Sequence, residues 1–464
     1  MFAAMSDDGM PRLLEKIRDK SAEICVIGLG YVGLPLAVAF AEAGFKTTGV
    51  DSDRSKIEGI RQGETHIRDG HVEIKMPQLV TRGGLSASAD LESSVRRADI
   101  IILCLPTPID DRKRPDLRII QDGLAEVSSV LAAGKFIVIE SSVYPGFTQE
   151  VAKPILEKSG LKAGADFGLA YSPERIDYGN RQHYLTEINK VVGGINETCT
   201  DVAAELYNCI LRAGVTKVSS PSVAEAAKML ENIYRFVNIS LVNELAVLFE
   251  AMKIDTFEVV RAAATKPFGF QPYFPGPGIG GHCIPKDPYY LEFKARQKGT
   301  GLKILSASAR IDSGMAHHVC RGVRLTLREL GKKMKGSRIT VLGLSYKGET
   351  DEIRRTPAIG VISGMSEMGA RVRVYDPYVP EITAGRRRYR SEKTINDAFL
   401  RSDCCAFLVD HKAFQGLDFG LLRQNAAPPP FVYDARGIFN GPELARRGIC
   451  YAGLGRPSLL SRDV

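Results

Sequence analysis

A loop rich in glycine and proline carries the residue of this chain best suited to covalent chemistry. Residues 276–291 have the sequence GPGIGGHCIPKDPYYL, with four glycines in the first six positions. No regular helix or strand tolerates that composition. The loop delivers one thiol, Cys283, and Gly280 and Gly281 just before it would allow a ligand to approach the backbone closely. The alternative is a tight turn around a buried structural cysteine.

Charged side chains flank the thiol. His282 and Lys286 place positive charge near Cys283, and Asp287 follows the thiol by four residues. A cysteine beside positive charge can be held partly as thiolate, which is the nucleophilic form. His282 taken alone equally suits a hydrogen-bonded structural residue, a base or a metal ligand. The loop is therefore a candidate site of nucleophilic chemistry.

A glycine fingerprint near the N-terminus indicates a dinucleotide. Gly28, Gly30 and Gly33 form G-x-G-x-x-G between an apolar run typical of a buried strand and an Ala-rich run typical of a buried helix. Asp51 ends the next predicted strand and would hydrogen-bond the adenosine ribose, which favours NAD over NADP. Arg54 lies close enough to leave NADP open. A βαβ unit without a ligand is the alternative.

The same alternation of strands and helices continues and places further polar residues at strand ends. Ligands of open parallel sheets bind at the carboxyl ends of the strands. Thr107 and Ser142 are therefore candidate cofactor contacts, or else hydroxyls that cap the next helix. Glu174 lies in a proline-initiated turn at the same edge. The predicted strands are 24–27, 46–50, 99–105, 136–142, a strand beginning at 169, 190–194 and 215–218.

The middle of the chain is helical. A run with helical periodicity and no Gly or Pro covers about 222–252, long enough to link two domains. Lys228 and Asn232 are four residues apart and share a face of this helix. They face either a cavity or solvent. A second helix is predicted over about 306–330.

The final third repeats the plan of the first without its fingerprint. Strands are predicted from 338, over 371–376, 404–409 and 431–434, with a helix over 357–368. A Rossmann-like domain of this kind takes a different nucleotide or none. Lys347, Arg354 and Arg436 follow predicted strands and would suit an anionic phosphate ligand.

The composition excludes several classes. The chain has 464 residues, 44% hydrophobic and 25% charged, with a net charge of +8, too diffuse to indicate nucleic acid. The basic run 386–390 is predicted to be a solvated loop or helix face. Nine cysteines without a CxxC pair argue against zinc or any other metal and suit a reducing cytosol. Because no signal peptide or membrane span is evident, a soluble cytoplasmic protein is expected.

We therefore expect an α/β protein with two Rossmann-like doubly wound domains, joined by a long central helix and a helical middle domain. The predicted boundaries are an N-terminal extension at 1–20, an NAD-binding domain at 21–219, a helical central domain with the cysteine loop at 220–331, and a second Rossmann-like domain, for a different nucleotide or none, at 332–464.

Taken together, these residues resemble the UDP-glucose/GDP-mannose dehydrogenase family from about Ser21 onward. The motifs are GLGYVGLP at 28–35, AKxxxN at 227–232 and GGHCIPKD at 280–287. The cysteine loop and the preceding KPFGF at 266–270 look most like the UDP-N-acetylglucosamine 6-dehydrogenases of the family. The resemblance implies an NAD-dependent, four-electron oxidation of the sugar C6 alcohol to a carboxylate.

The resemblance also implies roles for five residues. Cys283 would be the nucleophile that attacks the C6 aldehyde. Lys228 would stabilise oxyanions, with Asn232 beside it. Asp287 would help to activate water or tune Lys228, and Glu174 matches an acid near the reacting carbon.

The remaining implied contacts form two sets and include no metal ligand. The expected cofactor contacts are Gly28, Gly30, Tyr31, Val32, Gly33, Asp51, Arg54, Thr107, Ser142, Lys286 and Arg354. The expected contacts to the UDP-sugar substrate are Glu174, Lys228, Asn232, Tyr273, Gly276, Gly280, Lys347 and Arg436. A homodimer or higher homo-oligomer is expected as well, since the family usually pairs through its middle helices.

Two departures from the family pattern leave the sugar open. Tyr178 stands where the UDP-glucose enzymes often have a second glutamate. The arginine that some relatives offer across a dimer interface is not evident, and Lys266 is the nearest candidate. The alternatives are the same chemistry on UDP-glucose, UDP-GalNAc or UDP-ManNAc, a two-electron hydroxyacid-type dehydrogenase, or a nucleotide-sugar-binding protein without activity.

Overall fold

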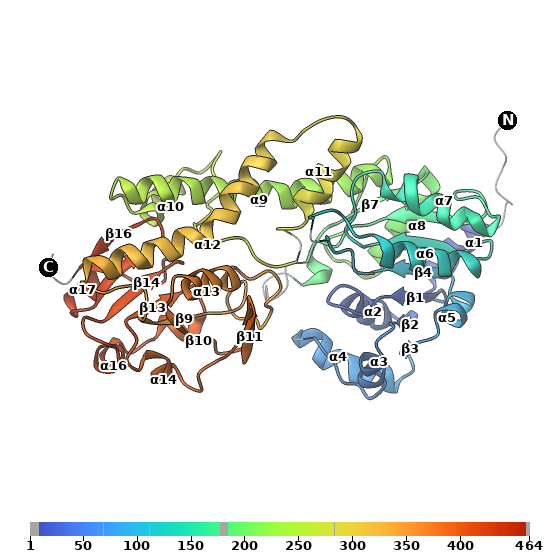
Figure 1. The fold of residues 1–464 in the computed structure, drawn as a ribbon. Coiled ribbons are helices and arrows are strands. Elements are labelled where there is room, and N and C mark those ends of the chain that lie inside the picture. The colour runs from blue at the N-terminus through green and yellow to red at the C-terminus, as the bar shows by residue number, and fades with distance from the viewer. Residues whose placement is uncertain (1–8, 68, 111, 177–183, 283, 461–464) are drawn as a thin grey trace. The chain divides into compact units, whose positions relative to one another are not determined.

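The computed structural model describes residues 9–67, 69–110, 112–176, 184–282 and 284–460. Within these ranges the chain forms two compact units (Figure 1). The N-terminal unit contains the chain up to Glu231 together with Tyr289–Thr300. The C-terminal unit contains Asn232–Pro288 and the chain from Gly301 onward.

The N-terminal unit is built on an eight-stranded sheet in the order β3-β2-β1-β4-β5-β6-β7-β8. Neighbouring strands are parallel except β6 and β7, which are antiparallel. The strands are β1 (Glu23–Ile27), β2 (Lys46–Val50), β3 (Leu85–Ser88), β4 (Ile100–Leu103), β5 (Phe136–Ile139), β6 (Gly168–Tyr171), β7 (Lys190–Gly194) and β8 (Val215–Lys217). Every residue of β4, β5 and β6 is buried, as parallel strands covered on both faces require.

Helices flank this sheet and begin at local capping signals. Asp53, Asp69, Asp90 and Asn196 each accept hydrogen bonds from the first backbone N–H groups of a helix. The helices are α1 (Gly9–Arg18), α2 (Gly33–Glu42), α3 (Arg54–Arg61), α4 (Gly70–Thr81), α5 (Leu91–Arg97), α6 (Arg118–Ser129), α7 (Lys153–Leu156) and α8 (Glu197–Asn208), with short turns at Thr148–Ala152, Glu157–Ser159 and Leu185–Glu187. The N-terminal extension forms α1, which packs against α8 through buried apolar side chains.

The C-terminal unit contains a second, six-stranded sheet in the order β10-β9-β13-β14-β15-β16, parallel except for the last pair. Its strands are β9 (Arg338–Leu342), β10 (Arg371–Tyr375), β13 (Cys404–Phe407), β14 (Phe431–Asp434), β15 (Cys450–Gly453) and β16 (Arg456–Leu459). Its helices are α10 (Thr256–Ala263), α12 (Lys303–Glu329), α13 (Pro357–Glu367), α14 (Ile395–Phe399), α15 (Lys412–Gln415), α16 (Phe419–Asn425) and α17 (Gly441–Arg446). In this unit α12 packs against α13 (Figure 1).

Two long helices confirm the predicted helical middle of the chain. The helix α9 (Pro221–Ala251) has 31 residues, and the boundary between the two units falls within it, after Glu231. The helix α12 has 27 residues. With the two parallel sheets, they confirm the predicted fold class of two Rossmann-like domains and a helical middle region.

Two local predictions were wrong. The basic run 386–390 was expected to be a loop or a helix face, but it contains strand β12 (Arg387–Arg390), which pairs antiparallel with β11 (Glu381–Ala384). This short pairing is not visible in the charge pattern. The loop 276–291 ends earlier than predicted, because α11 (Asp287–Gln297) already begins at Asp287.

In the part of the chain that the structure describes, no helix combines the length and the apolar character that a membrane span requires.

Candidate active site

The glycine fingerprint forms an open cradle at the end of β1. Gly28 has a left-handed φ of +94°, and a Cβ there would lie 2.6 Å from the carbonyl oxygen of Cys104. A Cβ on Gly33 would lie 1.9 Å from the carbonyl oxygen of Gly28. Gly30 differs, since no described heavy atom lies within 4 Å of the position its Cβ would take. The first and third glycines are thus needed for turn and helix packing, and the second leaves space of the kind a pyrophosphate needs. Val32 stands at the N-terminus of α2, and the positive end of the helix dipole there suits an anion.

The predicted ribose-binding acid lies at the edge of this cradle. Asp51 follows β2, and its Oδ2 accepts a hydrogen bond of 2.9 Å from the backbone N of Leu29. Lys56, which the sequence did not single out, places its Nζ 3.2 Å from the same oxygen. Arg54 is exposed at the start of α3 and forms no ion pair with any residue that the structure describes. The local geometry of the glycine cradle and Asp51 therefore fits a dinucleotide.

Thr107 and Ser142 are brought together by the ends of β4 and β5. The Thr107 hydroxyl donates to the carbonyl oxygen of Ser142 at 2.7 Å. The Tyr290 hydroxyl in turn donates to the carbonyl oxygen of Thr107 at 2.9 Å. Thr107 is 2% exposed, so its side chain braces these two loops. Contact of either residue with a cofactor stays a prediction.

Glu174 is fixed in a tight turn after β6. Its Oε1 accepts hydrogen bonds of 2.6 Å from the backbone N of both Arg175 and Ile176. Its Oε2 is buried and has no hydrogen-bond partner among the described residues. One oxygen therefore anchors the side chain, and the other suits a proton or a substrate hydroxyl.

A buried lysine lies behind Glu174. The Nζ of Lys190 is 2.7 Å from Oε2 of Glu140 and 4.0 Å from Oε2 of Glu174. The Tyr207 hydroxyl donates to the other oxygen of Glu140. Burial by itself would lower the pKa of Lys190, but the charges of Glu140 and Glu174 outweigh burial and raise it. The lysine thus stays cationic and balances two carboxylates in the interior.

The residues predicted on the long helix share one face and are nearly buried. Lys228 and Asn232, one turn apart on α9, are each 7% exposed. In the C-terminal unit, the Nδ2 of Asn232 donates a 2.6 Å hydrogen bond to Oδ2 of Asp287. The Oδ1 of Asp287 is buried without a hydrogen-bond partner in the described part of the chain, and Nζ of Lys286 lies 3.8 Å from it. Two predicted residues, Asn232 and Lys286, therefore converge on the carboxylate of a third, Asp287.

The positive charge expected from His282 is not present at neutral pH. Burial lowers the pKa of His282 to about 3, and the cationic neighbours Lys286, Arg354 and Arg355 contribute to the shift. The positive field in this part of the loop comes from those neighbours, with Lys286 1% exposed. The neutral histidine is an unsuitable thiolate partner, because it carries no charge. Cys283 itself and Tyr178 lie outside the described residues.

Gly280 and Gly281 in the loop leave room for another part of the protein, the side chain of Tyr346. A Cβ on Gly280 would lie 2.6 Å from Cβ of Tyr346, and one on Gly281 would lie 2.9 Å from the Tyr346 ring. The expectation that these glycines let a ligand approach is therefore not supported by open space, because the loop after β9 fills it. Substrate contact through the Gly280 backbone stays a prediction. The start of the loop is held by the buried Asn243, whose Oδ1 accepts from the backbone N of Gly276 at 2.9 Å.

The candidate phosphate-binding residues lie where the strands of the C-terminal sheet end. Lys347 follows β9, and its Nζ lies 5.5 Å from the centre of the Tyr346 ring. Arg436 follows β14 beside Gly276, whose Cβ would lie 2.7 Å from Nη1 of Arg436. Arg354 binds Glu352 through Nε at 2.8 Å. Tyr273, the remaining predicted contact, packs edge-on against Tyr234.

The loop after β9 has a glycine turn like that of the fingerprint. Gly343 has a φ of +92°, and Asp376, at the end of β10, accepts from the backbone N of Leu344 at 2.6 Å. The same Asp376 oxygen is 3.1 Å from Nε2 of the buried His411, and its other oxygen accepts from the backbone N of Tyr378 at 2.8 Å. Both oxygens of this acid are engaged, so it braces the loop that carries Lys347.

Comparison with known families decides the relationship. Three family models match consecutive parts of the chain: the UDP-glucose/GDP-mannose dehydrogenase family NAD binding domain at residues 22–211, its central domain at 222–313 and its UDP binding domain at 340–441. The chain belongs to the UDP-glucose/GDP-mannose dehydrogenase family. It is accordingly an NAD-dependent nucleotide-sugar dehydrogenase, and the open glycine cradle is the part of the N-terminal unit that suits NAD.

Relatives within the family act on different sugars by name. The chain is 39% identical over 424 residues to UDP-N-acetyl-D-glucosamine 6-dehydrogenase of Pseudomonas aeruginosa, covering 91% of this chain and 98% of that protein. A solved UDP-D-ManNAc dehydrogenase from Pyrococcus horikoshii matches with a TM-score of 0.86 and 29% identity, over 95% of this chain and 100% of that one. An NDP-N-acetyl-D-galactosaminuronic acid dehydrogenase from Methanosarcina mazei matches with a TM-score of 0.83 and 31% identity, over 97% and 98%.

Sequence reasoning missed the residues that support this dehydrogenase's predicted site residues. Lys190 and Glu140 are charged residues beside the apolar runs of β7 and β5, and that contrast was a usable signal for a buried ion pair. Asn243 is a polar residue in a largely apolar helix, but its hydrogen bond to Gly276 is visible only in three dimensions. His411 had no comparable signal.

Proposed function

We propose that this protein oxidises the C6 alcohol of a UDP-N-acetylhexosamine, with UDP-GlcNAc as the first candidate, to the uronic acid. The observation that carries the proposal is the buried hydrogen bond of 2.6 Å between Asn232 of α9 and Asp287, which lies on the same segment as Cys283. One oxygen of the Asp287 carboxylate is oriented, and the other has no hydrogen-bond partner among the described residues. Because this carboxylate lies four residues from a thiol, it suits hydrolysis of a thioester. The 39% identity to an enzyme named for UDP-GlcNAc supports the choice of sugar.

The reaction balances as two two-electron oxidations and one hydrolysis. The C6 alcohol loses a hydride and a proton to give the aldehyde, and the Cys283 thiol adds to the aldehyde to give a thiohemiacetal. Loss of a second hydride and a proton gives a thioester, and water cleaves it to carboxylate and free thiol. When bound, NAD supplies the hydride acceptor for both oxidations. The second hydride transfer needs a hydrated or thiol-bound aldehyde, because a free aldehyde carries no tetrahedral carbon bearing both oxygen and a transferable hydride. In this proposal the Cys283 thiol supplies that carbon centre.

Four of the predicted site residues have a part in these steps. Lys228 stabilises the oxyanion of the thiohemiacetal, since it is nearly buried and has no ion-pair partner among the described residues of its own unit. Asn232 orients Asp287, and the Oδ1 of Asp287 accepts a proton from the attacking water. Glu174 offers its Oε2 to the sugar or to water near the reacting carbon.

The test is the yield of NADH per mole of limiting UDP-GlcNAc, with the product identified by mass spectrometry. Two NADH and a uronic acid are expected. One NADH with an aldehyde product would indicate a two-electron enzyme and a structural Cys283. Faster turnover of UDP-glucose, UDP-GalNAc or UDP-ManNAc, in parallel assays at equal concentration, would overturn the choice of sugar without overturning the chemistry.

The nucleophile has a separate test. Cys283→Ser is expected to abolish uronic acid formation while NADH binding, followed by its fluorescence, is retained. The matched control is Cys320→Ser, because Cys320 is buried in α12 and has no part in the proposal. Undiminished uronic acid production by Cys283→Ser would refute the assignment.

We also propose a homodimer that forms through α9. Tyr234, Leu241 and Leu248 recur every seven residues on this helix and are 47%, 49% and 52% exposed, and an exposed apolar row of this kind typically meets a partner helix. Leu241→Glu with Leu248→Glu is expected to give a monomer in light scattering. Arg328→Glu, an exposed charge reversal on α12, is the control. A wild-type monomer would remove the proposal.

The predicted domain boundaries remain part of the proposal, as does a cytoplasmic location. The three family matches, at 22–211, 222–313 and 340–441, support the division into 21–219, 220–331 and 332–464. The eight described cysteines are all free thiols, which supports a reducing compartment.

A further inference from the structure

The C-terminal unit has a pocket at the edge of its sheet that is remote from the candidate phosphate-binding residues. The pocket lies where β9, β10 and β13 begin, whereas Lys347 and Arg436 lie beyond the ends of β9 and β14. The length of a five-residue strand, about 15 Å, separates the two edges. The pocket has a volume of about 610 Å³, within the range of small-molecule sites. It is therefore a separate place on the same domain.

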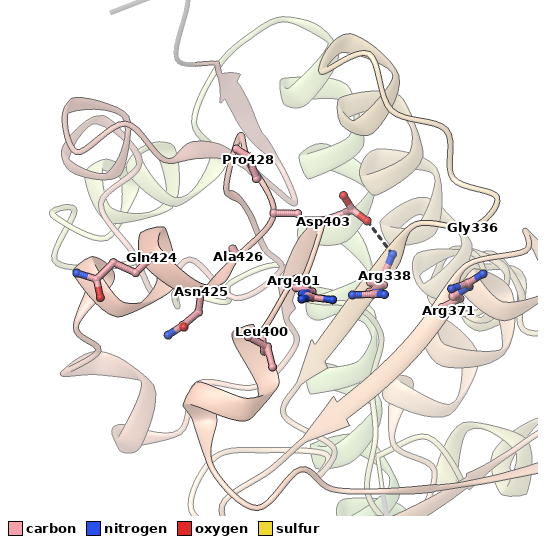
Figure 2. Close-up of a pocket in the computed structure, with 11 residues that line it drawn as sticks. Gly336, Arg338, Arg371, Leu400, Arg401, Asp403, Gln424, Asn425, Ala426 and Pro428 are labelled. Carbon is pink, nitrogen blue, oxygen red and sulfur yellow. Dashed lines mark hydrogen bonds between the residues drawn. The ribbon is translucent and has the colours of Figure 1, made fainter.

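Three arginines dominate the lining. Arg338 opens β9, Arg371 opens β10, and Arg401 precedes β13 (Figure 2). Within the described ranges, none of the three guanidinium groups has a carboxylate oxygen within 4 Å, and none donates a hydrogen bond to the protein. Their charge is thus not used to hold the fold together.

The acid that lines the pocket, Asp403, does not offset this charge. Its Oδ2 accepts from the backbone N of Arg338 at 2.9 Å, and Nζ of Lys332 lies 2.9 Å from its Oδ1. The Asp403 carboxylate is thereby neutralised by Lys332. The net charge that faces the pocket comes from the three arginines.

The walls supply hydrogen-bond donors and apolar surface. The side-chain amides of Gln424 and Asn425 form no hydrogen bond within the described part of the chain, and both residues line the pocket, although the Gln424 side chain points away from the arginines (Figure 2). Leu400, which is 50% exposed, and Pro428 add apolar surface. Arg401 has a left-handed φ of +53°, and its backbone N donates to the carbonyl oxygen of Asn425 at 2.7 Å. A non-glycine residue held in that conformation is unusual outside functional or tightly constrained loops.

We propose that this pocket is a second anion-binding site, which takes a phosphorylated small molecule. Guanidinium groups bind phosphate oxygens with paired N–H donors, and three of them without a carboxylate partner match the charge of a pyrophosphate or of a phosphate with a further anionic group. The apolar wall suits the organic part of such a ligand. This site is independent of which sugar the enzyme oxidises.

Inorganic pyrophosphate is the probe, titrated calorimetrically into the full-length protein with UDP and NADH present in saturating amounts. Those two ligands occupy the family's own phosphate-binding sites. One equivalent of pyrophosphate per chain is expected to bind. Arg338→Gln with Arg401→Gln is expected to weaken this binding at least about tenfold. The matched control is Arg386→Gln with Arg387→Gln, which removes the same charge from exposed positions at the β11–β12 hairpin.

Absence of pyrophosphate binding in the presence of UDP and NADH would overturn the proposal. So would equal weakening in the pocket variant and the hairpin variant, because that result would mean binding by overall charge. Retained NADH formation by the pocket variant confirms that it is folded and keeps the result interpretable. Should that variant fail to fold, Arg371→Gln alone, on an exposed side chain, gives the same comparison with Arg387→Gln.

Discussion

Replacing Lys190 by methionine should destabilise the N-terminal unit, because Lys190 is the only described cation within 4 Å of either Glu140 or Glu174 in this buried cluster. At an effective dielectric constant of about 20, its distances of 2.7 and 4.0 Å correspond to attractions of about 6 and 4 kcal/mol, before the cost of burying the charges is subtracted. Breaking a buried pair by removing one partner typically costs about 3–5 kcal/mol. For a unit of this size, that corresponds to a fall in Tm of about 6–20 °C.

The pH dependence gives this prediction a direction. Burial raises the pKa of Glu140, and loss of Lys190 removes the charge that opposes the rise. A carboxyl whose folded pKa lies above its unfolded value binds more protons in the folded state. As pH falls and Glu140 takes up a proton, the loss of stability in the variant relative to wild type should become smaller. The full loss of stability should be measured at about pH 8.

The assay is scanning calorimetry of the full-length protein, and the control is a double variant. Lys190→Met with Glu140→Gln removes both charges of the 2.7 Å pair and leaves only Glu174, 4.0 Å from the lysine, without its counter-charge, so it should recover at least half of the lost Tm. A fall of under about 2 °C in the single variant, or a double variant as unstable as the single one, would refute the reasoning.

Three further predictions concern the site itself. Asn232→Leu should lower kcat at least about tenfold in steady-state assays, because Asp287 loses the hydrogen bond that orients it. An unchanged kcat would contradict this role. Gly33→Ala should lower both Tm and NADH affinity, since its Cβ would meet a backbone oxygen at 1.9 Å, whereas the control Gly30→Ala should spare Tm. His282, with a pKa of about 3, should be neutral from about pH 5 upward, so His282→Gln should leave the pH profile of kcat/KM unchanged. Acid should destabilise wild type between about pH 6.5 and 3, since only the unfolded histidine takes a proton there, and this variant should lose that slope in urea titrations.

The sequence predicted most strands of the two large sheets because their signals are local. The strands 46–50, 190–194 and 431–434 have the predicted bounds, since each short run ends at, or just before, a glycine or an aspartate. The glycine fingerprint also worked, because close packing at Gly28 and Gly33 is dictated by a backbone geometry that only glycine permits.

The pairing partners in the supporting contacts could not be predicted, because they join residues distant in sequence. Lys190 meets Glu140 across 50 residues, and Asn243 meets Gly276 across 33. The charge assigned to His282 failed for a related reason. Burial and the cations Lys286, Arg354 and Arg355 set its protonation, and of these only Lys286 was visible in the sequence around it.

The two glycine turns of this enzyme have a consequence for the order of events. Gly28 and Gly343 adopt the same conformation, with φ of +94° and +92°, and each is followed by a backbone N–H bound to the acid of the next strand. Asp376, however, has a fully buried side chain packed against His411, whereas the side chain of Asp51 is 10% exposed, so the second turn works as a brace. The described part of the chain thus has one fingerprint cradle for a reaction that removes four electrons. Under the proposed chemistry the first reduced dinucleotide must depart and a fresh one must enter while the sugar remains bound, so exchange of cofactor in mid-cycle becomes a step of the catalytic cycle in its own right.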